Sequence, residues 1–211
     1  MKIREFVNQF GSPFSEGLGI DLKSKKSEEI CKWFLASILY GKPIREPSAT
    51  NTYRAFENDN LLTASKIVDA GWEVLVTDLD EGGYTRYDFS TATRLLEVFG
   101  NLRKWYGGDL NRLHSLAKDS RDLEKRLKEL GKGIGDTTVS IFLRDMRIVW
   151  PKADPKPSPL VKLAMQELKI NDLKAFARAK RVDLTRLETA LLRLGKDFLR
   201  KGKSITIEAN R

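Results

Sequence analysis

The chain has 211 residues, of which 41% are hydrophobic and 32% are charged. This length and composition suit one sizeable core or two small packed subdomains, and they exclude a disordered tail. Lys and Arg number 38 against 29 Asp and Glu, a formal net charge of +9. Such a basic balance indicates a polyanionic partner, although Lys-rich helix faces also occur as plain solvated surface. Because the chain shows neither a long apolar run nor a signal-peptide pattern, we expect an intracellular protein of the cytoplasm or nucleoid, without a membrane partner.

The positive charge is uneven along the chain. Residues 1–100 hold 12 basic and 15 acidic side chains, whereas residues 101–211 hold 26 and 14. We therefore expect the attraction for a polyanion to centre on the second half of the chain.

Metal-ligating side chains are scarce. Cys31 is the only cysteine, which excludes an internal disulfide and a cysteine-rich zinc or iron–sulfur site. Its neighbours in EEICKWFLASILY are apolar at helical spacing, so we expect Cys31 in the core. His114, the only histidine, lies in NRLHSLA without a ligand partner nearby, and we expect a structural role for it.

The periodicity of apolar residues is helical along almost the whole first half. A helix that Ser27 can cap ends before Gly41 and buries a wide apolar stripe. The segment WEVLVTDL after Gly71 has β-type residues but also fits a short helix, so we draw no sheet from it. The sequence predicts helices at Glu28–Tyr40, from Pro47 through Phe56, at Thr63–Ala70 and from Asp88 through Trp105.

The second half continues the helical pattern. Four of the chain's seven prolines lie in PKADPKPSP, residues 151–159, which predicts a stiff extended loop. SITIE, residues 204–208, suits a short strand or an exposed tail. The predicted helices are Asp109–Leu116, Ser120–Leu130, Thr137–Val149, Pro159–Leu168, Asn171–Lys180 and Asp183–Arg200.

The run Leu127 to Gly135, LKELGKGIG, lies between two predicted helices and contains two glycines as G-I-G. Glycine permits the left-handed geometry of a tight hairpin and lets the backbone touch a partner. The first N–H groups of the following helix have no partner within that helix, so they suit phosphate oxygens. A helical hairpin can also turn on two glycines for packing alone. The residues expected at a phosphate are Lys132, Gly133, Ile134, Gly135 and Thr137.

The longer run GKGIGDTTVSIFLRDMRIVWPKADP resembles the helix-hairpin-helix superfamily of DNA glycosylases, which includes endonuclease III and the adenine and 8-oxoguanine glycosylases. In that family the hairpin reads roughly L-P-G-V-G-x-K-T-A, and an essential Asp follows the second glycine after about twenty residues. Here Asp154 lies 19 residues after Gly135. Upstream, ICKWFLASILYGKPI is similar to the family helix that ends at the DNA-inserting loop, and GGYTRYDFSTATRLLEVFGNL to the helix before the hairpin. The resemblance covers about 130 residues, Glu28 to Val161.

The resemblance implies an all-α fold of two packed helical subdomains with a cleft between them. The first, of six helices, would span about 28–138, and the second would combine about 1–27 with 139–211. It also implies a monomeric repair glycosylase that hydrolyses the N-glycosidic bond of a damaged or mismatched base flipped out of double-stranded DNA. Asp154 would be the catalytic carboxylate, stabilising the oxocarbenium-like sugar or deprotonating the attacking water. No cofactor is required and no iron–sulfur cluster is expected, but Na⁺ or K⁺ is plausible on the backbone carbonyls of Gly131 and Ile134.

The chain departs from the family pattern inside the hairpin. Bifunctional members have a lysine where this chain has Thr137, and a threonine cannot form the imine with the sugar C1′. This favours a monofunctional mechanism. Lys132 in the hairpin and Lys42 in the expected DNA-inserting loop keep an associated AP lyase activity open, although both are more simply phosphate contacts. The extra residue in Leu130-Gly131-Lys132-Gly133, where the family has Leu-Pro-Gly, predicts a reshaped hairpin.

Base recognition is the least specific part of the pattern, and the sequence does not identify the base that is removed. A base-flipping enzyme needs a wedge in the stack and walls for the flipped base. Aromatic residues at such places are also ordinary core residues. The wedge candidates are Tyr40, Lys42, Pro43 and Ile44, and the pocket candidates are Tyr84, Arg86 and Tyr87.

Three alternatives stay open at this point. Asp154 could form a local Asx turn before Pro155. The chain could be a DNA-binding module that keeps the hairpin without catalysis, which the threonine at Thr137 would favour. It could also be a helical protein–protein adaptor with a basic face.

Overall fold

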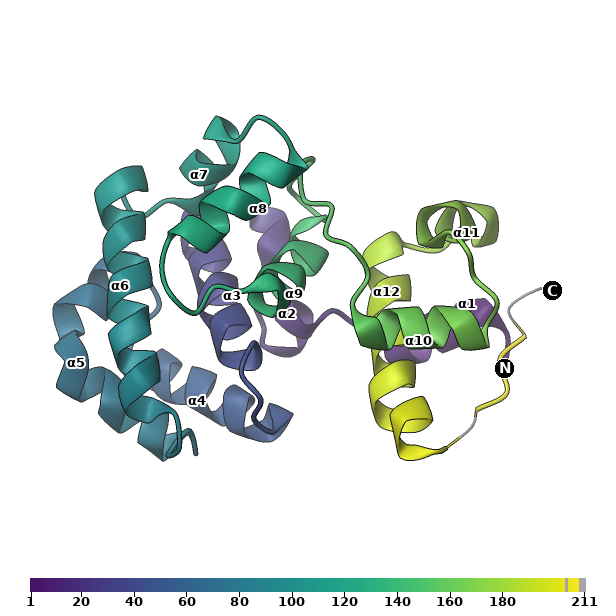
Figure 1. Ribbon diagram of the computed structural model, residues 1–211, viewed down its shortest axis with the longest axis horizontal. Coiled ribbons are helices and arrows are strands. Elements are labelled where there is room, and N and C mark those ends of the chain that lie inside the picture. The colour runs from purple at the N-terminus through teal and green to yellow at the C-terminus, as the bar shows by residue number, and fades with distance from the viewer. Residues whose placement is uncertain (204, 209–211) are drawn as a thin grey trace. The chain divides into compact units, whose positions relative to one another are not determined.

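The computed structural model describes residues 1–203 and 205–208, and over these residues the chain is all-helical (Figure 1). This confirms the predicted fold class. The chain divides into two compact units: unit 1 is Met1–Gly19 with Lys156–Arg211, and unit 2 is Ile20–Pro155. This division differs from the approximate boundaries expected at 28 and 138, because the helix after the hairpin and the loop to Pro155 belong to the same unit as the hairpin. Among the described residues, no helix is long and apolar enough to cross a membrane.

Unit 2 consists of seven of the labelled α-helices and a short 3-10 turn, Leu22–Ser24. Three of the helices begin at a side chain that accepts a backbone N–H from the first turn, namely those capped by Thr63, Asp109 and Asp119. The helices are α3 (Ser27–Tyr40), α4 (Glu46–Asn58), α5 (Ala64–Glu81), α6 (Asp88–Tyr106), α7 (Leu110–Leu116), α8 (Ser120–Glu129) and α9 (Asp136–Met146).

Helix α3 is the centre of the unit 2 core. It is buried on nearly all sides from Ile30 to Leu39, as expected of a helix with apolar residues around its circumference. Its Trp33 Nε1 donates to the Phe142 carbonyl of α9 at 3.1 Å, and the Phe34 ring lies edge-on to Phe142, with centroids 5.0 Å apart. Cys31 is 2% exposed and burial raises the pKa of its thiol to about 12, which confirms its expected place in the core.

Two local expectations differ from the structure. Ser27 is the first residue of α3 and not its cap, and its hydroxyl donates to Asp109 Oδ1 at 2.8 Å. The segment WEVLVTDL continues α5 beyond a kink at Gly71, whose φ of 80° and ψ of 175° interrupt the helix. Its β-type residues are helical because one side of the segment packs against α6.

Unit 1 combines the two ends of the chain. Its helices are α1 (Ile3–Phe10), α2 (Phe14–Gly17), α10 (Pro159–Glu167), α11 (Leu173–Lys180) and α12 (Leu184–Arg193). The core of the unit joins α1 to the C-terminal helices through Phe6, Val7, Leu187 and Leu191. The last helix is α-helical only to Arg193 and continues as a π turn, Leu194–Phe198, and a 3-10 turn, Leu199–Lys201, in place of the single helix expected to Arg200.

The strand considered for SITIE falls partly on Ser204, which lies outside the described residues. Of the others, Glu208 forms an isolated parallel bridge with Lys2. No strand is present among the described residues.

The charge of the molecule follows the units and not the two halves of the sequence. Unit 1 contains 16 Lys and Arg against 8 Asp and Glu, a net charge of +8, while unit 2 contains 22 against 21, a net charge of +1. Most of the positive charge expected in the second half of the chain therefore belongs to unit 1, from residue 156 onward. The hairpin belongs to the nearly neutral unit.

Gly82, at the end of α5, lies where α5 closely approaches α4, so its substitution tests this contact. Its helical backbone would accept alanine, but a Cβ there would lie 2.3 Å from Thr52 Cα, a backbone atom that cannot move aside cheaply. We expect Gly82→Ala to lower the free energy of unfolding by about 1–3 kcal/mol, measured by urea denaturation.

Gly100 in α6 is the matched control, because no atom lies within 4 Å of the position that a Cβ would take there. Gly100→Ala should raise stability by up to about 1 kcal/mol through helix propensity. Equal losses in both variants would show that α4 and α5 are not in close contact at Gly82.

Candidate nucleic-acid interface

The segment between α8 and α9 forms the expected glycine hairpin, but its two glycines have different roles. Gly133 has a φ of 109°, which an L side chain rarely adopts, and a Cβ there would meet Arg94 Cδ at 2.9 Å. Gly135 has an extended backbone, with φ −97° and ψ −177°, and no atom lies within 4 Å of its Cβ position. The left-handed geometry expected of both glycines therefore holds for Gly133 alone, and open space surrounds Gly135.

Helix α6 holds one side of the hairpin. Asn101 Nδ2 donates to the Leu130 carbonyl at 2.9 Å, and the Lys132 N–H donates to Glu97 Oε2 at 3.2 Å. A Cβ on Gly131 would lie 2.9 Å from Val98 Cγ2, so the chain passes α6 at close range. These contacts fix the hairpin and occupy the Lys132 N–H, which is no longer available to a phosphate.

The other N–H groups of the hairpin remain available. Within the described residues, the N–H groups of Gly133, Gly135 and Asp136 have no hydrogen-bond acceptor, and the first bond of α9 runs from the Val139 N–H to the Gly135 carbonyl at 3.0 Å. Gly135, the N-cap, supplies no side-chain cap. Gly133, Gly135 and Asp136 are all exposed. This is the donor arrangement that binds anions at a helix N-terminus.

Two cations lie beside the hairpin. A Cβ on Gly133 would be 3.6 Å from Lys42 Nζ, so Lys42 at the end of α3 and Arg94 of α6 both reach this glycine. Burial, and secondarily repulsion from Arg94, lower the pKa of the Lys42 ammonium. An anion bound there would relieve this repulsion. Lys132 is exposed in the hairpin itself.

Carboxylates partly balance this charge. Asp136 at the start of α9 forms an ion pair with Lys128 Nζ at 2.5 Å, and that contact lowers the pKa of Asp136. Glu97 is exposed and accepts the Lys132 N–H. The site is therefore a small patch with specific donors and not a broad basic surface.

The backbone carbonyls expected to hold a monovalent cation lie in the same turn. The Gly131 carbonyl accepts the Ile134 N–H at 3.3 Å, which leaves one of its lone pairs for a ligand. No group of three or more His, Cys, Asp or Glu suited to a metal occurs among the described residues. A cation at the hairpin would therefore rest on backbone oxygens, and this site stays a prediction.

Asp154 lies in the loop after α9, at the opposite end of that helix from the hairpin in chain order. The helix has 11 residues, which corresponds to about 16 Å along its axis. The loop is firmly attached to α7: Trp150 Nε1 donates to Asn111 Oδ1 at 3.0 Å, and Lys152 Nζ donates to the His114 carbonyl at 2.7 Å. Asp154 is partly exposed on this rigid support.

His114 is part of that support. Its ring stacks on Trp150 with centroids 4.7 Å apart, and burial together with the Lys152 ammonium lowers its pKa. A histidine held neutral against an indole fits the structural role expected for it.

The structure distinguishes the wedge candidates. Tyr40 is half-buried and its hydroxyl lies 2.7 Å from Thr50 Oγ1, so it is held against α4. Pro43 is exposed and Ile44 partly so, in the loop that also carries Lys42. This loop is the part of the candidate wedge that a ligand can reach.

Tyr84 is not a pocket wall. It is 1% exposed, and its hydroxyl donates to the Leu39 carbonyl near the end of α3, which an α-helix leaves without an internal partner. Arg86 is exposed with its guanidinium over the Tyr87 ring, 5.7 Å from the centroid, so these two stay pocket candidates.

Arg94 and Glu97 are the site residues that sequence reasoning missed. They share one face of α6 with Val98 and Asn101 at spacings of three, four and seven residues, which is the face that meets the hairpin. The spacing was visible in the sequence. Which element that face contacts depends on tertiary packing.

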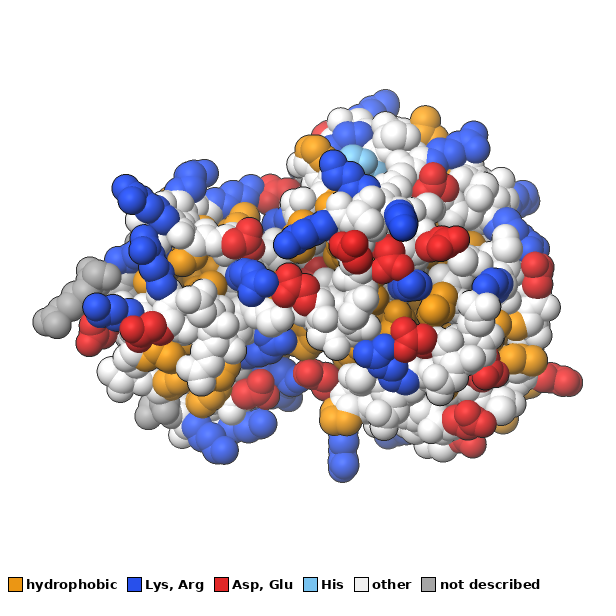
Figure 2. All heavy atoms as spheres, turned by 180° about the vertical axis from the view of Figure 1, so that it is seen from behind, with side chains coloured by type: hydrophobic (Ala, Val, Ile, Leu, Met, Phe, Trp, Pro, Cys, Tyr) orange, Lys and Arg blue, Asp and Glu red, His pale blue; other side chains and the backbone are white. Residues whose placement is uncertain are grey.

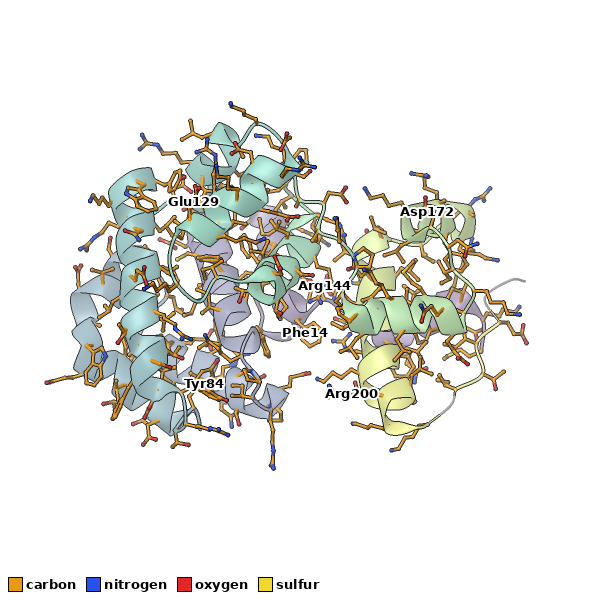
Figure 3. All side chains as sticks on the ribbon, viewed as in Figure 1. Phe14, Tyr84, Glu129, Arg144, Asp172 and Arg200 are labelled. Carbon is orange, nitrogen blue, oxygen red and sulfur yellow. The ribbon has the colours of Figure 1, made fainter. Side chains whose placement is uncertain are left out.

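Helix α9 contains a buried ion pair. Arg144 and Asp145 are 5% and 0% exposed, and Arg144 Nε donates to Asp145 Oδ1 at 3.0 Å; Arg144 is labelled in Figure 3. A buried charge is stable in the interior only when it is paired, and this pair lies in the helix that joins the hairpin to the Asp154 loop.

No protein-family model, curated protein or solved structure matches this chain. The features of the chain that indicate a function are therefore its motifs and the geometry of its hairpin.

The two glycines make a matched pair for testing the hairpin. We expect Gly133→Ala to lower the free energy of unfolding by about 1–3 kcal/mol, because alanine is strained at that φ and its Cβ would press on Arg94. Gly135→Ala should change it by less than about 0.5 kcal/mol. Thermal and urea denaturation measure both, and an equally large loss at Gly135 would contradict this geometry.

Proposed function

We propose that this protein is a DNA repair glycosylase that hydrolyses the N-glycosidic bond of a damaged or mismatched base flipped out of duplex DNA. The observation that carries the proposal is that Lys42 and Arg94 both reach Gly133, in a hairpin whose Gly133 and Gly135 N–H groups have no acceptor among the described residues. Such an arrangement suits a DNA phosphate and is independent of base sequence.

The chemical step is assigned to Asp154. Its carboxylate would stabilise the positive charge that develops on the sugar as the base leaves, or take a proton from the water that attacks C1′. The attachment of its loop to α7 through Trp150 and Lys152 supports this role, because a catalytic group must be held in place. Thr137 is exposed at the position where bifunctional glycosylases of the helix-hairpin-helix superfamily have their lysine, which supports hydrolysis by water.

Asp154→Asn tests the assignment. We expect the variant to keep its affinity for duplex DNA and to lose base release by at least about 100-fold, since an amide neither carries charge nor accepts a proton from water. The assay uses a panel of duplexes, each with one damaged or mismatched base, analysed with and without alkali treatment. Strand breaks that require alkali indicate a monofunctional glycosylase.

Asp119→Asn is the matched control, because Asp119 caps α8 and asparagine caps helices equally well. It should retain full activity. Wild-type protein that binds duplexes but releases no base would instead indicate the non-catalytic module. Protein that does not bind duplex DNA would favour the protein–protein adaptor.

An associated AP lyase activity is the second candidate, and the position of Lys42 favours it. Its amine lies at the hairpin beside Arg94, and its lowered pKa increases the fraction of neutral, nucleophilic amine. The amine would add to C1′ of an abasic sugar and lose water to form an imine. β-Elimination would then break the C3′–O bond, with the 3′ phosphate as the leaving group.

Borohydride trapping tests this activity, because hydride reduces the imine to a stable covalent adduct. We expect the adduct to disappear in Lys42→Ala and to persist in Lys66→Ala, an exposed lysine of α5. Loss of the adduct in Lys132→Ala, with retention in Lys42→Ala, would assign the activity to the hairpin lysine. Absence of an adduct in wild-type protein would exclude the lyase.

A further inference from the structure

Unit 1 carries nearly all of the net charge of the protein, a net +8, although the hairpin is in unit 2. Lys and Arg side chains gather over the part of unit 1 that contains α11 (Figure 2). The residues proposed for phosphate binding and for catalysis all belong to unit 2. They therefore do not explain why unit 1 is so strongly positive.

Helix α11 has a buried apolar side with exposed basic residues beside it. Leu173 and Ala177 are buried in the unit 1 core. Lys174 and Arg178 are one turn apart, at i and i+4, on the side next to these apolar residues, Arg181 follows as the C-cap of the helix, and all three are exposed. We refer to these three residues as the α11 basic face.

Helix α11 is capped at both ends, and its exposed neutral residues have small side chains. Asp172 caps α11 by accepting the Ala175 N–H at 2.9 Å, and Arg181 ends it with a φ of 52° and ψ of 47°. Ala175 and Ala179 are also exposed, on the side of α11 beyond Lys174 and Arg178, and small side chains there let an extended polyanion approach the helix closely. The pKa of the Asp172 carboxyl is lowered, chiefly by the Ala175 N–H that it accepts and to a smaller extent by the charges of Arg178 and Lys174.

The helix after the turn does not offer a base-reading surface. In helix-turn-helix proteins, the first residues of the second helix contact base edges. Here α12 follows α11 after a three-residue turn, 181–183, but Thr185 and Glu188 are buried, and Arg186 is paired with Glu16 Oε2 at 2.8 Å. The first turn of α12 is therefore not available to contact base edges. The exposed cations of α11 are left to contact the phosphate backbone alone.

We propose that the α11 basic face is a second, sequence-independent binding surface for the phosphate backbone of double-stranded DNA. The choice of duplex DNA as the partner rests on the proposed function. The surface supplies affinity through counterion release, while the hairpin supplies the local geometry at one phosphate.

The test is fluorescence anisotropy of the full-length protein with an undamaged duplex over a series of salt concentrations. Each phosphate contact contributes about 0.9 to the slope of log K against log salt. We expect K174A/R178A/R181G to reduce this slope by about 2–3 and the affinity by about tenfold or more. Glycine is used at 181 because it accepts the positive φ.

The control removes the same charge from unit 2. K104A/R112A/R121A neutralises three exposed cations outside the hairpin contacts, and it should leave the slope unchanged. The charge-retaining variant K174R/R178K should also keep the wild-type slope, and circular dichroism checks that each variant is folded. An equal fall in K174A/R178A/R181G and in the control would overturn the proposal, because the effect would then be one of net charge.

The outcomes separate this inference from the proposed function. Wild-type binding that is unchanged in K174A/R178A/R181G, with base release intact, overturns the second surface alone. Absence of wild-type binding to any duplex overturns both. Binding of wild-type protein to phosphatidylserine vesicles but not to duplex DNA, with loss in the variant, overturns the choice of partner and with it the proposal.

Discussion

The packing of α3 is the constraint on which the candidate interface depends. Trp33 and Phe34 attach this helix to α9, and Tyr84 holds the Leu39 carbonyl near its end. Because α3 is fixed in this way, the loop after it brings Lys42 to Gly133, and a Cβ on Gly41 would lie only 2.3 Å from Thr138 Oγ1. Loops carry binding groups accurately only when the elements on both sides are rigid. The interface is thus a product of an apolar core and not of the surface charges.

Local patterns in the sequence were sufficient for the helices and for the existence of the hairpin. Helix caps, prolines and the 3.6-residue period are short-range signals, and they gave the class and most helix positions. They did not predict backbone conformations that depend on tertiary packing. These are the kink at Gly71, the π turn from Leu194 and the extended backbone of Gly135. Arg94 was missed for the same reason, since a helix face can be read from spacing but its partner cannot.

The charge distribution shows a different limit of sequence reasoning. Residues 101–211 include both the hairpin and the C-terminal helices, so their summed charge does not describe one surface. The fold instead joins residues 1–19 to residues 156–211, so the basic helices belong with an N-terminal segment that is neutral in balance. Linear counts describe a surface only when the segment counted folds as one body.

The distribution of charge between the two units also affects how the protein would bind a polyanion. At the hairpin, Glu97 and Asp136 accompany the cations, and repulsion from Arg94 already lowers the pKa of Lys42. Adding further positive charge there would depress that pKa more and add repulsion when no phosphate is bound. Long-range attraction is better placed on a separate surface, because electrostatic steering depends on total charge while a phosphate clamp depends on donor geometry. A neutral hairpin unit joined to a basic helical unit satisfies both requirements without placing them at the same residues.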